Sequence, residues 1–176
     1  SKMGAVFICC LAAVVLFYGA DYFMASAMYG FGDLSRPLQS VLDFLGSTWQ
    51  ISVGSYLFYY LLCKLLTYML WSIILFTVCI VARKSVQVYA TAVIIVGVSC
   101  GLYYTIDAVS SFCLLKYINL FFFLNTSKLF SDYLNLNLCG FPVSFVPIFF
   151  TVAALGIALL FVINIRVFSK QKIVQF

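Results

Sequence analysis

Hydrophobic residues are gathered in long blocks along this chain. Four apolar runs stand out, at residues 5–24, 52–82, 86–106 and 143–165. A hydrocarbon core needs roughly 20 apolar residues in a helix to span it, and each run is long enough. The pattern therefore predicts an all-α, polytopic membrane protein with about four transmembrane helices in a single domain, residues 1–176.

Polar residues mark the segments between these runs. Residues 25–51 form a loop that carries Asp33, Arg36 and Asp43, and Arg83-Lys84-Ser85 predicts a tight turn. Residues 107–142 are rich in Leu and Phe but contain too many Lys, Asn and Asp residues to cross lipid as one helix. We interpret them as interfacial or re-entrant helices before the last span, closed by a turn at Cys139–Pro142.

Composition supports a membrane protein. Hydrophobic residues make up 65% of the chain, charged residues 9%, and His and Glu are absent. A soluble domain of this size cannot bury that much apolar surface, so we expect the chain to lie in a lipid bilayer. The net charge of +5 sits at the ends of the apolar runs and forms no basic patch. This distribution predicts orientation in the membrane and no nucleic-acid partner.

The positions of Lys and Arg predict the orientation. Three basic clusters fall on one side of a four-span topology: Lys2; Arg83 and Lys84; and Arg166, Lys170 and Lys172. By the positive-inside rule this side is the cytoplasm. We expect both termini to be cytoplasmic in the cell membrane, with residues 25–51 and 107–142 outside.

The first run has a second interpretation as a signal peptide. Lys2, the apolar stretch and Ala25-Ser26-Ala27 resemble its n-region, h-region and cleavage site. We favour a retained span, because residues 19–24 make an overlong and partly apolar c-region.

Charged residues near or inside the spans are candidates for a translocation path. Lys64 lies well inside the second run, where a charge costs at least ~2.5 kcal/mol, and it is expected to face other helices or meet a carboxylate. Asp21 and Asp107 are the candidate partners. The alternative is that Lys64 reaches the headgroups, because its run is longer than a span requires.

Small residues at a spacing of four predict helix packing. Gly97 and Gly101 in the third run, and Ala154 and Ala158 in the fourth, have the spacing that lets helices approach closely in lipid. The contact is either within the chain or across a dimer.

Catalysis is not expected, because the chain has no nucleotide loop and no Ser-His or Cys-His pair. Gly30-Phe31-Gly32-Asp33 matches the G-x-G-D signature of intramembrane aspartyl proteases, but its place in a polar loop favours a turn. The seven cysteines lack metal-site spacing. The five in the apolar runs are expected to pack there, and a Cys113–Cys139 disulfide is left open. No cofactor or metal is predicted.

Several segments resemble the permease subunits of exporter-type ABC transporters from Gram-positive bacteria. They are Leu114–Phe121, Phe130–Asn137 and Gly140–Pro142 before the last span, and earlier Gly32–Val41, Ile51–Leu57 and Lys64. The resemblance implies a six-helix fold with a re-entrant helical hairpin outside, formed here by residues 107–142. Two spans of that fold are missing, which indicates a C-terminal fragment.

The resemblance also implies a mechanism. A separate ATPase subunit hydrolyses ATP while two permease chains, as a homo- or heterodimer, move an amphipathic substrate such as a peptide, lipid or drug. Arg83 and Lys84 are the expected ATPase contacts. Leu34–Gly46 is amphipathic enough for the family's cytoplasmic coupling helix, although the charge pattern places it outside. The alternative function is a four-span accessory protein that assembles through Gly97 and Gly101, and a less favoured one is the protease.

Overall fold

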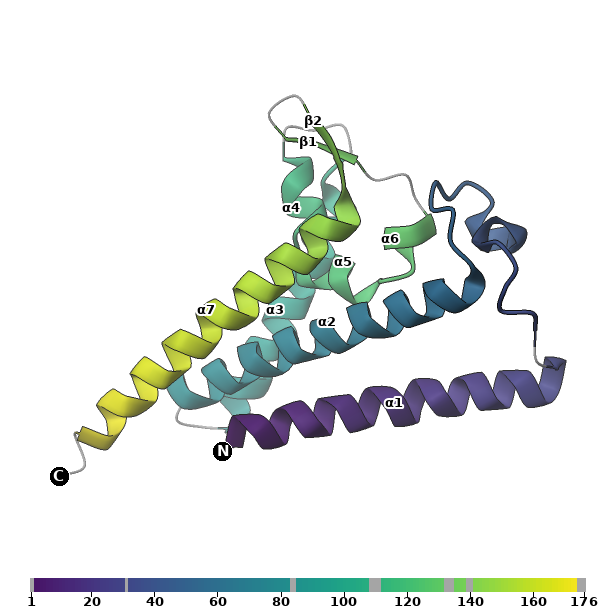
Figure 1. Ribbon diagram of the computed structural model, residues 1–176. Helices are drawn as coiled ribbons and strands as arrows, with labels where there is room; N and C mark the ends of the chain where they lie inside the picture. The colour runs from purple at the N-terminus through teal and green to yellow at the C-terminus, as the bar shows by residue number, and fades with distance from the viewer. Residues whose placement is uncertain are drawn as a thin grey trace. The chain divides into compact units, whose positions relative to one another are not determined.

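Four long helices dominate the computed structural model, which describes residues 2–30, 32–82, 85–107, 112–131, 135–138 and 141–173. They are α1 (Lys2–Tyr29), α2 (Val53–Val81), α3 (Ser85–Thr105) and α7 (Phe145–Ile173) (Figure 1). Each contains a stretch long and apolar enough to cross a membrane: Phe7–Met28, Val53–Val81, Ser85–Thr105 and Phe145–Val167. The predicted all-α, four-span architecture is confirmed, and the chain is a multi-pass membrane protein.

Large apolar side chains on these helices remain exposed in the single chain, among them Phe17, Phe58, Tyr89 and Leu155. In water such a surface would cause aggregation, whereas lipid tails cover it without cost. The helices are therefore apolar on nearly all sides.

Short elements fill the segment between α3 and α7. They are α4 (Cys113–Tyr117), α5 (Leu120–Leu124) and α6 (Lys128–Ser131), followed by β1 (Asn135–Leu138) and β2 (Phe141–Ser144). The helical prediction for this segment is confirmed. The two strands were not predicted: they pair antiparallel, with Asn135 opposite Ser144 and Leu138 opposite Phe141. The alternation of Asn and Leu in Asn135–Leu138 has the period of two that a strand requires.

The loop before α2 forms two 3-10 turns, η1 (Leu38–Ser40) and η2 (Leu42–Phe44), with an extended Val41 between them. Leu34–Gly46, which the resemblance would make a coupling helix, thus forms no continuous helix. Backbone hydrogen bonds hold the loop against the start of α2, since the Leu38 amide donates to Ile51 O at 2.8 Å and the Gly54 amide to Leu34 O at 2.9 Å. Gly54 permits this approach, because a Cβ there would lie 3.3 Å from Leu34 O.

The chain divides into two compact units, Ser1–Leu66 with Asn125–Pro147, and Thr67–Leu124 with Ile148–Phe176. Aromatic rings build the core of the first unit. The Phe130 ring of α6 lies 5.2 Å from Tyr56 and 6.1 Å from Trp49, and Phe44 lies 4.8 Å from Tyr56. These rings connect α2, α6 and the loop.

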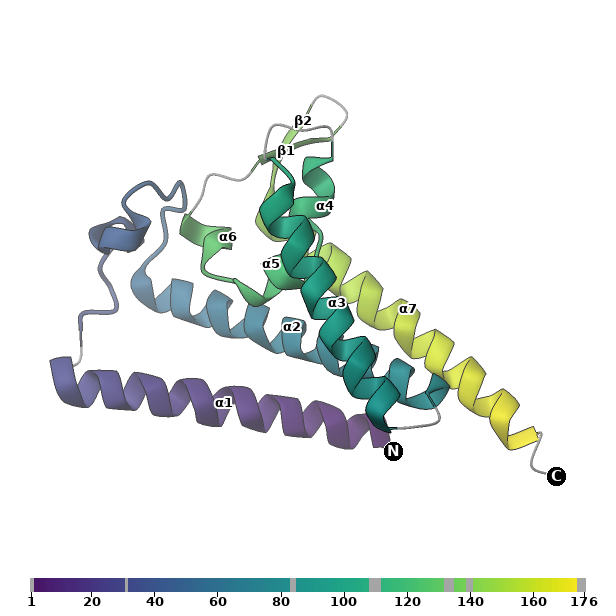
Figure 2. The same cartoon turned by 180° about the vertical axis from the view of Figure 1, so that it is seen from behind.

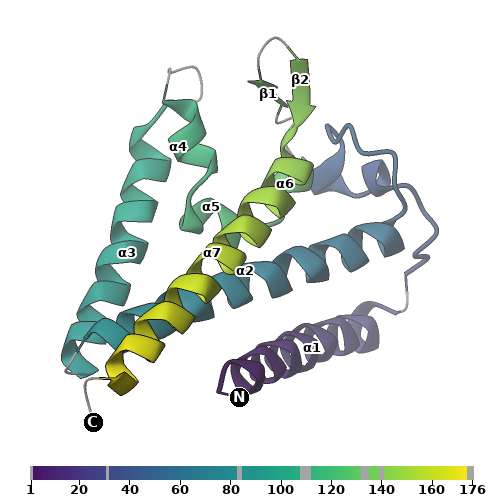
Figure 3. The same ribbon diagram turned by 60° about the vertical axis from the view of Figure 1, so that its left-hand side comes forward.

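The core of the second unit surrounds α5. Figures 2 and 3 show α4 and α5 folding back beside α3. Phe122 and Phe123 of α5 are buried, and the Phe123 ring lies 4.7 Å from that of Phe149 on α7. Farther along α7, a Cβ on Gly156 would lie 3.2 Å from Leu70 Cδ1, so this glycine allows α2 and α7 to approach closely.

Two adjacent alanines on α7 provide a test of this packing. Ala153 has no exposed surface, whereas Ala154 is exposed. We expect Ala153→Leu to lower the unfolding free energy by about 1–3 kcal/mol through overpacking. Ala154→Leu, the matched control, should leave it unchanged in a monomeric preparation. Thermal unfolding of the two variants in detergent measures the difference, and equal stability of both would contradict the observed α7 register.

Candidate functional site: an anchored helical hairpin

Lys64 lies in the first unit, where it is nearly buried, at 9% exposed. Its Nζ is 5.4 Å from the centre of the Tyr60 ring and 6.0 Å from that of Tyr18 on α1. The two rings meet edge to face at 5.8 Å. Cation–π contact of this kind stabilises an ammonium group that is held away from water. Lys64 thus faces protein within the unit, through aromatic rings that the sequence did not identify as its partners.

The other predicted charges lie in separate places. Asp21 is exposed on α1 and lines a cavity formed with α2. Asp107 is exposed just after the end of α3, in the second unit. Arg83 and Lys84 lie outside the described residues, so their predicted ATPase contact remains a prediction.

The small residues predicted to pack are exposed in the single chain. Gly97 and Gly101 lie on an open face of α3, where a Cβ would meet no described atom within 4 Å. Ala154 and Ala158 are exposed on α7. Packing of these four residues across a dimer remains a prediction. Within the second unit, the small residues that pack are Ala153 and Gly156.

The α4–α5 hairpin (residues 113–124) begins beside the end of α3. The ammonium of Lys116 donates a hydrogen bond of 2.9 Å to the carbonyl of Ile106, which directly follows α3, and lies 5.3 Å from the centre of the Tyr103 ring. A cation at a helix C-terminus interacts favourably with the carbonyls that have no helical partner. Lys116 therefore ties α4 to the end of α3.

Asn119 joins the two helices of the hairpin. Its Nδ2 donates to Lys116 O at 2.8 Å and to Leu115 O at 3.3 Å, and its Oδ1 accepts from the Phe122 amide at 2.8 Å. One buried side chain thus satisfies carbonyls at the end of α4 and an amide at the start of α5. This matters because a buried backbone group without a partner costs about 1–3 kcal/mol.

Thr67 anchors the end of α5, at Phe123 and Leu124, which is called here the tip of the hairpin. Its Oγ1 donates to Phe123 O at 3.2 Å, and Thr67 has no exposed surface. Thr67 is the central residue of α2, equally far from Val53 and Val81. At 1.5 Å per residue α2 is about 43 Å long, so wherever a core of about 30 Å lies along it, the centre falls inside that core. We therefore expect the tip of the hairpin to lie at hydrocarbon depth.

Contacts are described at both ends of the segment that contains the hairpin. Because α2 and α3 are consecutive spans joined by residues 82–84, the start of α2 and the end of α3 belong to the same side of the membrane. The chain enters the hairpin beside Ile106 and leaves it for α6, whose Phe130 packs on Tyr56 in the first turn of α2. These contacts are those expected of a re-entrant segment, and the choice between interfacial and re-entrant helices remains a prediction.

Replacement of the Thr67 hydroxyl tests the anchor. We expect Thr67→Val to cost about 1 kcal/mol, the usual worth of one hydrogen bond inside a membrane protein, and to loosen α5. Thr77→Val is the control, because the Thr77 hydroxyl only donates to Ile73 O within α2. Thermal unfolding and protease cleavage at residues 118–125 measure the effect; identical behaviour of the two variants would contradict the anchor.

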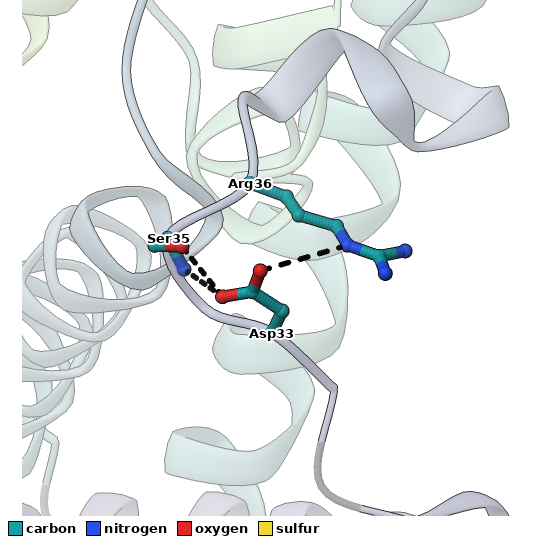
Figure 4. A network of polar contacts seen from close by, with 3 residues as sticks. All are labelled: Asp33, Ser35 and Arg36. Atoms are coloured by element: carbon teal, nitrogen blue, oxygen red, sulfur yellow. Dashed lines mark hydrogen bonds and ion pairs between the residues drawn. The ribbon is translucent and has the colours of Figure 1, made fainter.

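Asp33 belongs to an exposed polar turn (Figure 4). Its Oδ1 accepts hydrogen bonds from the Ser35 hydroxyl at 2.6 Å and the Ser35 amide at 3.0 Å, and Arg36 Nε lies 3.8 Å from Oδ2. The Ser35 hydrogen bonds are the main reason that the pKa of Asp33 lies below its ordinary value. Asp33 lies outside the long helices and has the local contacts of a turn residue.

The Asp33 turn is expected to depend on pH. Because the pKa of Asp33 is lower in the folded loop than in the unfolded chain, the turn is fully stabilised above the unfolded value of 3.8 and loses stability as pH falls through the folded value. Hydrogen exchange of the Ser35 amide should rise in acid relative to the intrinsic rate. Asp33→Asn should abolish this pH dependence, whereas an unchanged profile in that variant would rule out Asp33 as its source.

Three polar residues of the spans and hairpin were missed by sequence reasoning as site residues: Thr67, Asn119 and Asn164. Asn164 on α7 is 2% exposed, and neither its Nδ2 nor its Oδ1 has a hydrogen-bond partner among the described residues. The signal was available in part, since Thr67 and Asn164 each interrupt an apolar run. Such polar residues inside a span usually have a functional reason.

No protein-family model matches this chain, and neither a curated protein nor a solved structure matches it.

Proposed function

We propose that this chain is the membrane-spanning permease subunit of an ABC transporter of the exporter type. A separate ATPase subunit supplies the energy, and the chain itself performs no catalysis. Two copies, or this chain and a related one, form the path for an amphipathic substrate.

The observation that carries the proposal is the α4–α5 hairpin. It lies between the third and last long helices, and its tip is held at the centre of α2 by the Thr67 hydrogen bond. Non-helical backbone at membrane depth is tolerated where protein buries it or where it lines a water-filled path, and channels and transporters use such segments. The resemblance to ABC permeases implies a hairpin at this place in the chain.

Buried polar groups on the long helices support a protein that changes conformation. Lys64 is buried on α2, and Asn164 is buried on α7 without a described partner. Both incur a cost in the conformation described here. A second conformation in which Asn164 gains a hydrogen-bond partner would recover part of that cost. Transport by alternating access needs such a second conformation.

The loop structure favours the orientation with both termini in the cytoplasm. Residues 38–44 form two 3-10 turns and no continuous helix that could dock on an ATPase. With this loop outside, the cytoplasmic contacts available to the ATPase are the segment with Arg83 and Lys84 and the basic tail after Arg166.

An accessory protein without transport activity is the second candidate. The open face of α3 at Gly97 and Gly101 favours it, because small exposed residues at this spacing suit a contact with another helix. The same face suits a permease dimer, so the presence or absence of an ATPase decides between the two functions.

Purification from native membranes tests the proposal. We expect the tagged chain to retain a subunit that is photolabelled by azido-ATP and hydrolyses ATP. Arg83→Ala with Lys84→Ala should lower its recovery at least about fivefold, the effect of losing two cationic contacts worth about 0.5 kcal/mol each. Arg36→Ala is the control, because Arg36 is an exposed cation of the opposite loop.

The result that contradicts the permease is stable co-purification of other membrane proteins with no ATP-binding subunit. That outcome would favour the accessory protein. Loss of the ATPase in Arg36→Ala with retention in the double variant would reverse the proposed orientation.

A further inference from the structure

A cavity of about 760 Å³ lies between α1 and α2 within the first unit. This volume is in the range of small-molecule sites. The cavity extends along α1 from Leu11 to Tyr22, about 16 Å of helix. Its lining is almost wholly apolar or aromatic, and includes Val14, Tyr18, Leu57, Phe58 and Leu61.

Asp21 is the one acidic residue in the lining of this cavity. It lies inside the membrane-spanning stretch Phe7–Met28 and is exposed. Among the described residues, no cationic side chain forms an ion pair with it. A carboxylate in such a place is costly unless a cation accompanies it.

Polarity changes along the groove. A second cavity of about 410 Å³ shares Tyr22, Leu34 and Leu57 with the first and continues toward the loop. Its lining includes Ser26, Asp33, Arg36 and Ser40. Because Asp33 and Arg36 form an ion pair, their charges largely cancel and Asp21 supplies the net charge of the polar end. The opposite end, at Leu11 and Leu65, is apolar.

We infer that the α1–α2 groove binds a single-chain amphiphile with a cationic headgroup. The headgroup lies at the Asp21 carboxylate and beside the Tyr22 ring, and the chain extends toward Leu11 and Leu65. An anionic headgroup at Asp21 would meet a like charge.

Gly19 keeps the groove open. It lines the cavity, and a Cβ at this position would meet no described atom within 4 Å. A larger side chain there fills the groove without displacing any described neighbour. Since leucine also favours the helix more than glycine does, Gly19→Leu should block the chain site and leave α1 folded.

Photo-cross-linking tests the inference on the purified chain in nanodiscs, without any ATPase. The probe is a dodecylammonium that carries a diazirine on its chain, with dodecyl sulfate and dodecyl maltoside carrying the same group as comparison probes. We expect the ammonium probe to label peptides of α1 and α2. Asp21→Asn should lower this labelling about tenfold, as expected for the loss of a hydrogen-bonded charge pair.

Matched variants distinguish the site from general partitioning into lipid. Gly19→Leu should abolish labelling, whereas Gly97→Leu, at the equally open glycine of α3, and Asp107→Asn, at the exposed aspartate after α3, should not change it. Near-equal labelling by the three probes, or unchanged labelling in Asp21→Asn, overturns cationic recognition. Unchanged labelling in Gly19→Leu overturns the groove itself.

That this amphiphile is the transported substrate rests on the proposed function, whereas its binding does not. Labelling without a co-purified ATPase would support the groove and contradict the permease. A co-purified ATPase with no specific labelling would overturn the groove and leave the permease standing.

Discussion

The α4–α5 hairpin depends on one constraint: hydrocarbon offers no hydrogen-bond partners, so every backbone group at membrane depth must find one inside the protein. Side chains supply some of the hydrogen-bond partners that the backbone of such short helices lacks. Asn119 satisfies carbonyls of α4 and an amide of α5, and Thr67 donates to Phe123 O at the tip. Burial of Phe122 and Phe123 completes the shielding. Without these partners the segment would be driven to the interface, where water satisfies it.

The same constraint explains where the other polar groups of the spans lie. Lys64 is held by aromatic rings, and Asp21 opens into a cavity. Asn164 stays buried without a described partner. A protein selected only for stability would replace these side chains by apolar ones, because each adds a desolvation cost. Their presence fits the proposed function, in which the chain binds an amphiphile and alternates between conformations.

The lengths of the apolar runs predicted the four spans, because a span is a property of each segment alone. The polar residues of 107–142 likewise excluded a simple crossing. The Phe123 partner of Thr67 and the Tyr18 partner of Lys64 were not predictable, since they come from contacts between segments distant in sequence. The sequence also did not show that Ala153 is buried and Ala154 exposed. Adjacent residues differ by about 100° around a helix, and the packing of neighbouring elements decides which one is buried. The strands escaped notice because a four-residue alternation is a weak signal.

Measuring the depth of the hairpin tip decides whether α4 and α5 form a re-entrant segment. A nitroxide attached to a cysteine at Leu124, the last residue of α5, in a background cleared of the native thiols, reports depth through its relative exposure to oxygen and to a water-soluble nickel complex. We expect a position inside the hydrocarbon core, comparable to a label at an exposed position within the α3 span such as Val98. A label at the depth of the headgroups would make α4 and α5 interfacial helices and contradict the re-entrant hairpin on which the proposed function rests.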